Sequence, residues 1–304
     1  MNILEAHKVT KTYGDYTALN EVSINVRKDS VFGLLGPNGA GKTSLIRIIN
    51  QITAPDSGEV FFAGERLTAK HVEQIGYLPE ERGLYRKMKV GEQALYLARL
   101  KGLDKNTALS RLKYWFDKFE IASWWNKKVE ELSKGMQQKL QFIVTVIHEP
   151  DFLIFDEPFS GFDPINVNLL KQEMLALKQK GTTIIFSTHN MVSVEELCDD
   201  IALINKAEKI LEGNINEIKN KNKENLFKVQ YLENEVDLKT ILPDTAEIIA
   251  NHATHNNRLE VKIKLPKEMT SNDLVQLLIP HIQLCGFEEI YPSMNDIFIK
   301  SVIK

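Results

Sequence analysis

The stretch Val31-Phe32-Gly33-Leu34-Leu35-Gly36-Pro37-Asn38-Gly39-Ala40-Gly41-Lys42-Thr43 decides the fold of this 304-residue sequence. Its first five residues predict a buried strand, and residues 42–51 predict a helix. The glycine-rich turn between them has the spacing of a phosphate-binding loop, whose backbone N–H groups and helix dipole attract phosphate oxygens. Lys42 can then reach the β- and γ-phosphates, and the Thr43 hydroxyl can ligate magnesium. The alternative is a glycine turn that merely precedes an ordinary helix.

Strands and helices alternate through the first two thirds of the chain. This rhythm predicts an α/β fold with a largely parallel sheet. Further strands are expected at residues 60–63, 75–78, 152–155, 182–187, 201–204 and 209–211. Residues 90–149 have a helical pattern, with one apolar face that is built from Leu109, Leu112, Trp115, Phe116 and Phe119. These side chains, with Trp124 and Trp125, form either core or a partner-facing surface.

Two acids end the apolar strand Phe152-Leu153-Ile154-Phe155-Asp156-Glu157. Acids at the carboxyl end of a parallel strand stand where α/β sheets bind ligands. Beside a phosphate-binding loop, Asp156 is expected to hold magnesium and Glu157 to orient or deprotonate an attacking water. His189 follows the expected strand at 182–187 and points to the same edge of the sheet, where it can bond to the γ-phosphate or the water. A solvated turn and a structural histidine are the alternatives.

Composition narrows the class of protein. The chain is 43% hydrophobic and 26% charged with a formal net charge of −3, so it has no global field that would attract nucleic acid. Cys198 and Cys285 are far apart and lack metal-ligand spacing, which favours a reducing compartment. No stretch approaches the roughly 18 apolar residues of a membrane-spanning helix, and the first residues lack the layout of a signal peptide.

A further segment, Leu132-Ser133-Lys134-Gly135-Met136, precedes the acidic strand. Ser133 can cap a helix, which would expose the N–H groups of its first turn. With this segment in place, residues 3–213 resemble the nucleotide-binding subunit of an ABC transporter. The family's elements occur in order: aromatic Tyr13, the Walker A loop, the Q-loop segment that ends at Glu80, the signature at 132–136, Walker B, the D-loop at 160–163 and the switch residue His189.

The resemblance implies roles for particular residues. It implies Glu157, His189 and Lys42 as catalytic residues, and Thr43, Glu80 and Asp156 as magnesium ligands. The implied ATP contacts are Tyr13, Gly36, Pro37, Asn38, Gly39, Ala40, Gly41, Lys42, Thr43, Ser44, Ser133 and Gly135. Each ATP would lie between the loop of one copy and the signature of a second copy, where Ser133 and the Gly135 N–H meet the γ-phosphate.

The resemblance also implies an architecture and a setting. The fold would be a P-loop NTPase of ABC type, with a RecA-like core, an antiparallel β subdomain and a helical subdomain at about 88–149. The ATP-binding domain would occupy residues 1–222, and an accessory α+β domain residues 223–304. The subunit would be cytoplasmic and would sit at the inner face of the cell membrane through a separate permease. It would bind no nucleic acid.

Several positions depart from the common family pattern. Glu80 replaces a glutamine, so an acceptor-only carboxylate stands where an amide usually does. Lys134 and Met136 alter the signature, whereas Ser133 and Gly135 remain, and a working ATPase is expected. The basic residues Arg82, Arg86, Lys87 and Lys89 form either a solvated face or a permease contact.

The last quarter of the chain is expected to form a unit of its own. The polar run at 214–225 marks the boundary, with strands expected at 227–232, 247–250 and 259–265 and helices at 272–284 and 295–302, in a ferredoxin-like arrangement. This tail resembles the accessory domain of some exporter ATPases, including sodium-efflux-type subunits. The leading function is therefore an ATPase that powers an ABC exporter. The alternatives are an ABC ATPase of a non-transport membrane complex, or a ribosome- or DNA-associated one.

Overall fold

The chain is divided into two compact units, Met1–Ile215 and Asn216–Lys304. The computed structural model describes residues 1–81, 83–232, 236–254 and 257–303, so Arg82 of the basic cluster lies outside the described residues. The sequence predicts a boundary later in the chain, at 222/223, because residues 214–225 are polar. Helix α7 (Ile215–Lys221) occupies most of that run, and its Ile215 and Ile218 are buried.

A six-stranded sheet forms the centre of the first unit, in the order β10-β9-β3-β8-β7-β6. Its strands are β3 (Val31–Leu35), β6 (Ile75–Leu78), β7 (Phe152–Asp156), β8 (Thr183–Thr188), β9 (Asp200–Asn205) and β10 (Glu208–Asn214). All neighbouring pairs are parallel except β9 and the edge strand β10. Every residue of β3, β7 and β8 is buried, as is typical of parallel strands that are covered on both faces.

A second, antiparallel sheet packs beside the first in the same unit. It has the order β2-β1-β4-β5 and consists of β1 (Asn2–Tyr13), β2 (Tyr16–Arg27), β4 (Ser57–Phe62) and β5 (Glu65–Arg66). Helix α1 (Lys42–Ile49) shares one apolar core with both sheets, through residues such as Leu45 and Ile49. The ring contact between Phe62 and Phe152, at a centroid distance of 5.6 Å, joins β4 to β7 across this core.

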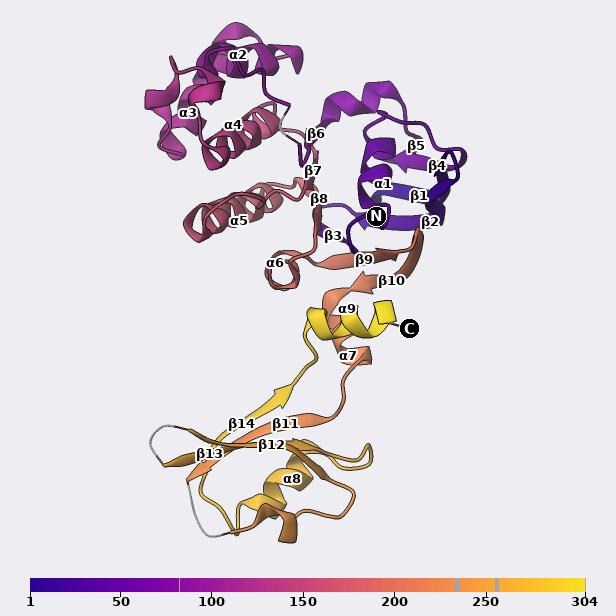
Figure 1. The fold of residues 1–304 in the computed structure, drawn as a ribbon, viewed down its shortest axis with the longest axis vertical. Helices are drawn as coiled ribbons and strands as arrows, with labels where there is room; N and C mark the ends of the chain where they lie inside the picture. Colours follow the sequence, from indigo (N-terminus) through magenta and orange to yellow (C-terminus); the bar gives the residue numbers. More distant parts are fainter. Residues whose placement is uncertain (82, 233–235, 255–256, 304) are drawn as a thin grey trace. The chain divides into compact units, whose positions relative to one another are not determined.

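The helical subdomain lies to one side of the sheet in Figure 1 and consists of α2 (Val90–Leu100), α3 (Lys105–Lys118) and α4 (Lys134–Val146). Leu112, Trp115, Phe116 and Phe119 are buried, and Trp115 and Phe119 contact Phe142 of α4. The aromatic face of α3 is therefore core. Helices α5 (Pro164–Gln179) and α6 (Met191–Leu197) complete the unit, with short 3₁₀ turns at Ala69–Gln74, Ala122–Trp124 and Val129–Glu131.

The second unit has an antiparallel sheet in the order β12-β13-β11-β14. Its elements are β11 (Leu226–Leu232), a 3₁₀ turn (Leu238–Thr240), β12 (Glu247–Thr254), β13 (Arg258–Lys264), α8 (Ser271–Leu278), β14 (Leu284–Ile290) and α9 (Met294–Ile303). The strand order and α8 match a ferredoxin-like arrangement, but the 3₁₀ turn at Leu238–Thr240 stands where that arrangement has its first helix. The predicted helix at 272–284 is wrong in its second half. Pro280 cannot continue a helix, and the chain returns as β14 beside β11.

Among the residues that the structure describes, every helix is too short or too polar to cross a lipid bilayer.

One buried amide offers a test of the packing in the helical subdomain. Gln93 of α2 is 0% exposed, and neither of its amide atoms has a hydrogen-bond partner in the described chain. An unsatisfied buried polar group costs about 1–3 kcal/mol, so Gln93→Met, of similar length and without the amide, should raise the free energy of unfolding by about 1 kcal/mol. Urea denaturation followed by circular dichroism measures this change. A loss of stability would show that the Gln93 amide has a partner such as a buried water.

Candidate nucleotide-binding site

The glycine-rich loop joins the end of β3 to the start of α1, and two of its glycines are required by their surroundings. Gly36 has φ +149°, and a Cβ there would lie 2.2 Å from the carbonyl oxygen of Ile204. Gly41 has φ +114°, and a Cβ there would lie 2.2 Å from the carbonyl oxygen of Ala18. No side chain fits at either position. Glycine therefore allows the tight backbone turn in which the loop presents its N–H groups.

Lys42 is held inside this loop. Its side chain is 7% exposed, and its Nζ donates to the carbonyl oxygens of Gly36 at 2.7 Å and Pro37 at 3.1 Å. Burial lowers the pKa of the Lys42 ammonium, against the opposing effect of the negative charges of Glu157, Asp156 and Glu80. Because those carboxylates favour the charged form, the site keeps a cation at the place where phosphate oxygens would arrive.

Asp156 ends β7 directly beside the loop. It is 2% exposed, and its Oδ2 accepts a hydrogen bond from Thr43 Oγ1 at 3.3 Å. Its Oδ1 accepts a hydrogen bond from Ser187 Oγ of the neighbouring strand β8. The carboxylate is thus oriented from both sides, and it joins the end of β7 to the first turn of α1.

Glu157 has a backbone conformation that is uncommon for a side-chain-bearing residue, with φ +47°. Its N–H donates to the carbonyl oxygen of Ser187 at 3.1 Å, and its Oε1 lies 2.8 Å from Nδ1 of His189. Thr188 Oγ1 approaches its other oxygen, Oε2, at 3.4 Å. Since a left-handed non-glycine residue costs about 1–2 kcal/mol, the surrounding bonds hold Glu157 in a strained but fixed position.

A cavity of about 320 Å³ collects most of the predicted residues. It is lined by residues 38–44 of the loop and by Glu80, Asp156, Glu157, Tyr16 and Ala18. Tyr16 was missed by sequence reasoning, although it begins β2 close to the loop and its hydroxyl donates to the carbonyl oxygen of Gly39 at 2.5 Å. Tyr13 is 43% exposed at the end of β1 and is not among the described residues that line this cavity.

Ser133 and Gly135 stand at the start of α4 and are likewise not among the described lining residues. Ser133 is the N-cap of α4, and its Oγ accepts a hydrogen bond from the N–H of Met136 at 3.3 Å. The capping interpretation is therefore confirmed, and the cap satisfies one of the N–H groups that the first turn of α4 cannot bond within the helix. Gly135 is partly exposed, so a ligand from another molecule has access to it.

The oxygen ligands of the cavity suit magnesium. Thr43 Oγ1, a carboxylate of Asp156 and the nearby Glu80 are hard donors, and Mg²⁺ usually combines one or two carboxylates with substrate phosphates. Within the described ranges, no group of three or more His, Cys, Asp or Glu side chains is arranged to hold a metal by itself. A metal at this position would therefore depend on the nucleotide for the rest of its ligands.

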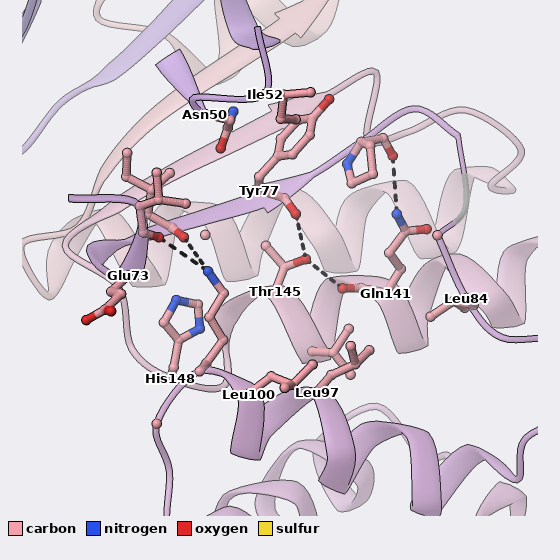
Figure 2. A pocket seen from close by; sticks show the side chains of 18 of the residues that line it. Asn50, Ile52, Glu73, Tyr77, Leu84, Leu97, Leu100, Gln141, Thr145 and His148 are labelled. Carbon is pink, nitrogen blue, oxygen red and sulfur yellow. Dashed lines mark hydrogen bonds between the residues drawn. The ribbon is translucent and has the colours of Figure 1, made fainter. Parts of the chain in front are cut away.

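An apolar groove of about 630 Å³ lies between the sheet edge and the helical subdomain (Figure 2). Leu97 and Leu100 of α2 form one wall, and Tyr77 of β6 lies opposite. Gln141 of α4 also lines the groove, and its Nε2 donates to the carbonyl oxygen of Pro79 at 3.3 Å. Since Pro79 precedes Glu80, this bond joins the groove to a residue of the nucleotide cavity.

The polar end of the groove is lined by Glu73, Lys101 and His148. Burial, with the nearby positive side chain of Lys101, lowers the pKa of His148 to about 4, so this histidine is uncharged at neutral pH. Outside the groove, Arg86, Lys87 and Lys89 are exposed and form no ion pair with another residue in the described part of the chain.

Comparison with known proteins places this geometry in a family. Residues 19–160 match the ABC transporter family model, and residues 213–302 match the C-terminal domain of DrrA1-3-like ATP-binding proteins. The chain is 42% identical over 301 residues to YhaQ of Bacillus subtilis, an uncharacterized ABC transporter ATP-binding protein, and the match covers 99% of this chain and 98% of YhaQ.

Two other similarities extend this comparison. The Nod factor export ATP-binding protein I of Burkholderia lata is 33% identical over 213 residues, which cover 69% of this chain and 70% of that protein. A solved ATP-binding subunit of an ABC transporter superposes with a TM-score of 0.67 at 29% identity, over 72% of this chain and 92% of the other. With a phosphate-binding loop, a paired Glu157 and His189, and a relative that matches nearly its whole length, this chain belongs to the ATP-binding subunits of ABC transporters.

Proposed function

We propose that this chain hydrolyses ATP to power an exporter-type ABC transporter, together with a separate membrane permease. The observation that carries the proposal is the pair of Glu157 and His189, joined at 2.8 Å beside a loop that holds a buried lysine. A carboxylate next to a phosphate site can accept a proton from water, and a histidine bonded to it can keep it oriented. The export direction is supported by a relative whose name specifies export.

The chemistry follows from where each group stands. The loop N–H groups and Lys42 would bind the β- and γ-phosphates, and Lys42 would exchange its bonds to the Gly36 and Pro37 carbonyls for phosphate oxygens. Glu157 would orient a water in line with the γ-phosphate and take its proton. With a proton on Nδ1, His189 would donate to Oε1 and leave Oε2 of Glu157 for the water.

Magnesium, held by Thr43, Asp156 and Glu80, would neutralise charge that develops on the phosphates. Within this chain, the hydrogen bonds of Asp156 to Thr43 and Ser187 keep that carboxylate in place before any metal arrives. Glu80 stands where the family usually has glutamine, and it adds a negative charge at the cavity. Closure of the two copies around ATP would therefore depend more strongly on a cation than it would with glutamine.

A second copy of this chain would complete each site. Ser133 and Gly135 lie at an exposed helix start, and their own cavity does not include them among its described lining residues. The N–H groups of that first turn, with the dipole of the 13-residue helix α4, would meet the γ-phosphate held by the other copy. ATP would thus draw two copies together, and its hydrolysis would release them.

The groove would receive a cytoplasmic segment of the permease, which would hold the subunit at the inner face of the membrane. Its apolar walls suit an amphipathic helix laid between α2 and β6. An occupant that moves Gln141 or Pro79 also moves Glu80, because Gln141 bonds to the carbonyl next to Glu80. Closure of the dimer and movement of the permease would be coupled by this route.

The catalytic role of Glu157 is tested by Glu157→Gln. The amide cannot take a proton from water, so kcat for ATP hydrolysis should fall by about 100- to 10,000-fold while ATP is still bound. A coupled-enzyme ATPase assay and titration with a fluorescent ATP analogue measure the two quantities. The matched control is Glu59→Gln, which alters an exposed glutamate that pairs with Arg66 at 3.2 Å. Undiminished turnover in Glu157→Gln would remove this residue from the catalytic role.

The docking role of the groove is tested by Leu100→Glu. Leu100 is 64% exposed, so a charge there should not unfold the chain, but the apolar face of a docked amphipathic helix would remove that charge from water. Permease recovered with the tagged chain from solubilised membranes should fall at least about tenfold, which corresponds to 1.4 kcal/mol.

Ile279→Glu is the matched control for this experiment, since Ile279 is 59% exposed in the second unit and does not line the groove. It should leave recovery of the permease unchanged. Full recovery with Leu100→Glu would rule out docking at this groove. Recovery of the wild-type chain with ribosomes or DNA in place of a permease would contradict the transporter assignment.

A further inference from the structure

One buried glutamine of α4 contacts the backbone next to the proposed catalytic carboxylate. Gln138 is 1% exposed, and its Nε2 donates to the carbonyl oxygen of Pro158 at 3.2 Å. Pro158 directly follows Glu157. Burial removes the Gln138 amide from water, which costs free energy that an apolar side chain would not lose. We therefore look for the role of Gln138 in its hydrogen bond to Pro158.

The segment that receives this bond is the strained one. Glu157 has φ +47°, and Ser160 donates its N–H to the carbonyl oxygen of Glu157 at 3.1 Å in a tight turn. A conformation of this kind persists only where its surroundings fix it. Ser187 fixes the strand side of Glu157 through its carbonyl oxygen, and Gln138 fixes the other side through Pro158.

The same helix begins at the signature segment. Gln138 lies one turn beyond Ser133 and Gly135, and a Cβ on Gly135 would lie 3.7 Å from the carbonyl oxygen of Gly161 and 3.8 Å from the ring of Phe162. Residues 158–162 therefore run along the first two turns of α4. A displacement of the start of α4 must also displace this segment. Gly135 packs against the segment, and Gln138 is joined to it by a buried hydrogen bond.

We infer that Gln138 is a positioning residue that links the signature start of α4 to Glu157. When the nucleotide of the other copy binds at Ser133 and Gly135, α4 is fixed, and Gln138 holds the Pro158 carbonyl so that Glu157 faces the water in its own site. Hydrolysis at one site thereby depends on occupancy of the other. This inference rests on the proposed function, since it takes Glu157 as the group that acts on water.

The test compares Gln138→Met with Gln93→Met in the full-length protein. Both variants replace a buried glutamine by a side chain of similar length, but only Gln138 donates to another residue in the described chain. Because a small misplacement of a reacting group can cost about 100-fold, kcat for ATP hydrolysis should fall about 10- to 100-fold in Gln138→Met with KM for ATP nearly unchanged. Gln93→Met should keep both constants.

A double-mutant cycle separates positioning from a general loss of structure. If Gln138 acts through Glu157, Gln138→Met should have no further effect on the residual rate of Glu157→Gln. An equal loss in both backgrounds, a loss no larger than that of Gln93→Met, or a loss that appears in KM alone would overturn the inference. Should Gln138→Met fail to fold, Gln138→Asn keeps the amide and withdraws it from Pro158 by one methylene.

The two proposals fail in different ways. Full turnover in Glu157→Gln alone would contradict the proposed function, whatever Gln138 does. A large loss in Glu157→Gln with no effect of Gln138→Met would leave the function intact and contradict only the link through α4.

Discussion

The parallel pairing of β3, β8 and β7 is the constraint on which the site depends. Leu35 pairs with Thr188, and Asp156 pairs with Ser187, so three strands end at one edge of the sheet. The phosphate-binding loop, the two acids and His189 then meet there, although the loop precedes the acids by more than a hundred residues in the chain. The burial of all three strands fixes this register, since a slip would place the polar ends in the core.

Features that depend on local patterns could be predicted from the sequence, whereas long-range contacts could not. Fully apolar strands such as Phe152–Phe155 and the glycine spacing of residues 36–43 carry their signal within a few residues, and the structure confirms those elements. The predicted helix at 272–284 is too long, because its apolar pattern extends past Pro280, which cannot continue a helix. Tertiary packing decides the remaining features, and a single sequence does not predict them. They are the left-handed backbone of Glu157, the position of Tyr16 at the cavity, and the hydrogen bonds of Gln138 and Gln141.

Helix α4 gives the three proposed activities a common element. Its start presents Ser133 and Gly135, its second turn holds Pro158 through Gln138, and its third holds Pro79 through Gln141. ATP contact, water activation and permease docking would therefore share one rigid helix. The altered signature residues Lys134 and Met136 leave these contacts in place, because the former is exposed and the latter contributes its backbone N–H to the Ser133 cap.

The central claim is that the signature of one copy closes on the ATP bound by the other. Sedimentation velocity tests this claim most directly. The samples are Glu157→Gln and the double variant Glu157→Gln with Ser133→Arg, each with magnesium and ATP. The account predicts a dimer for Glu157→Gln, and a monomer that still binds ATP when Ser133→Arg is added, because the loop remains intact while the signature is blocked. A dimer of undiminished stability in the double variant would contradict the account.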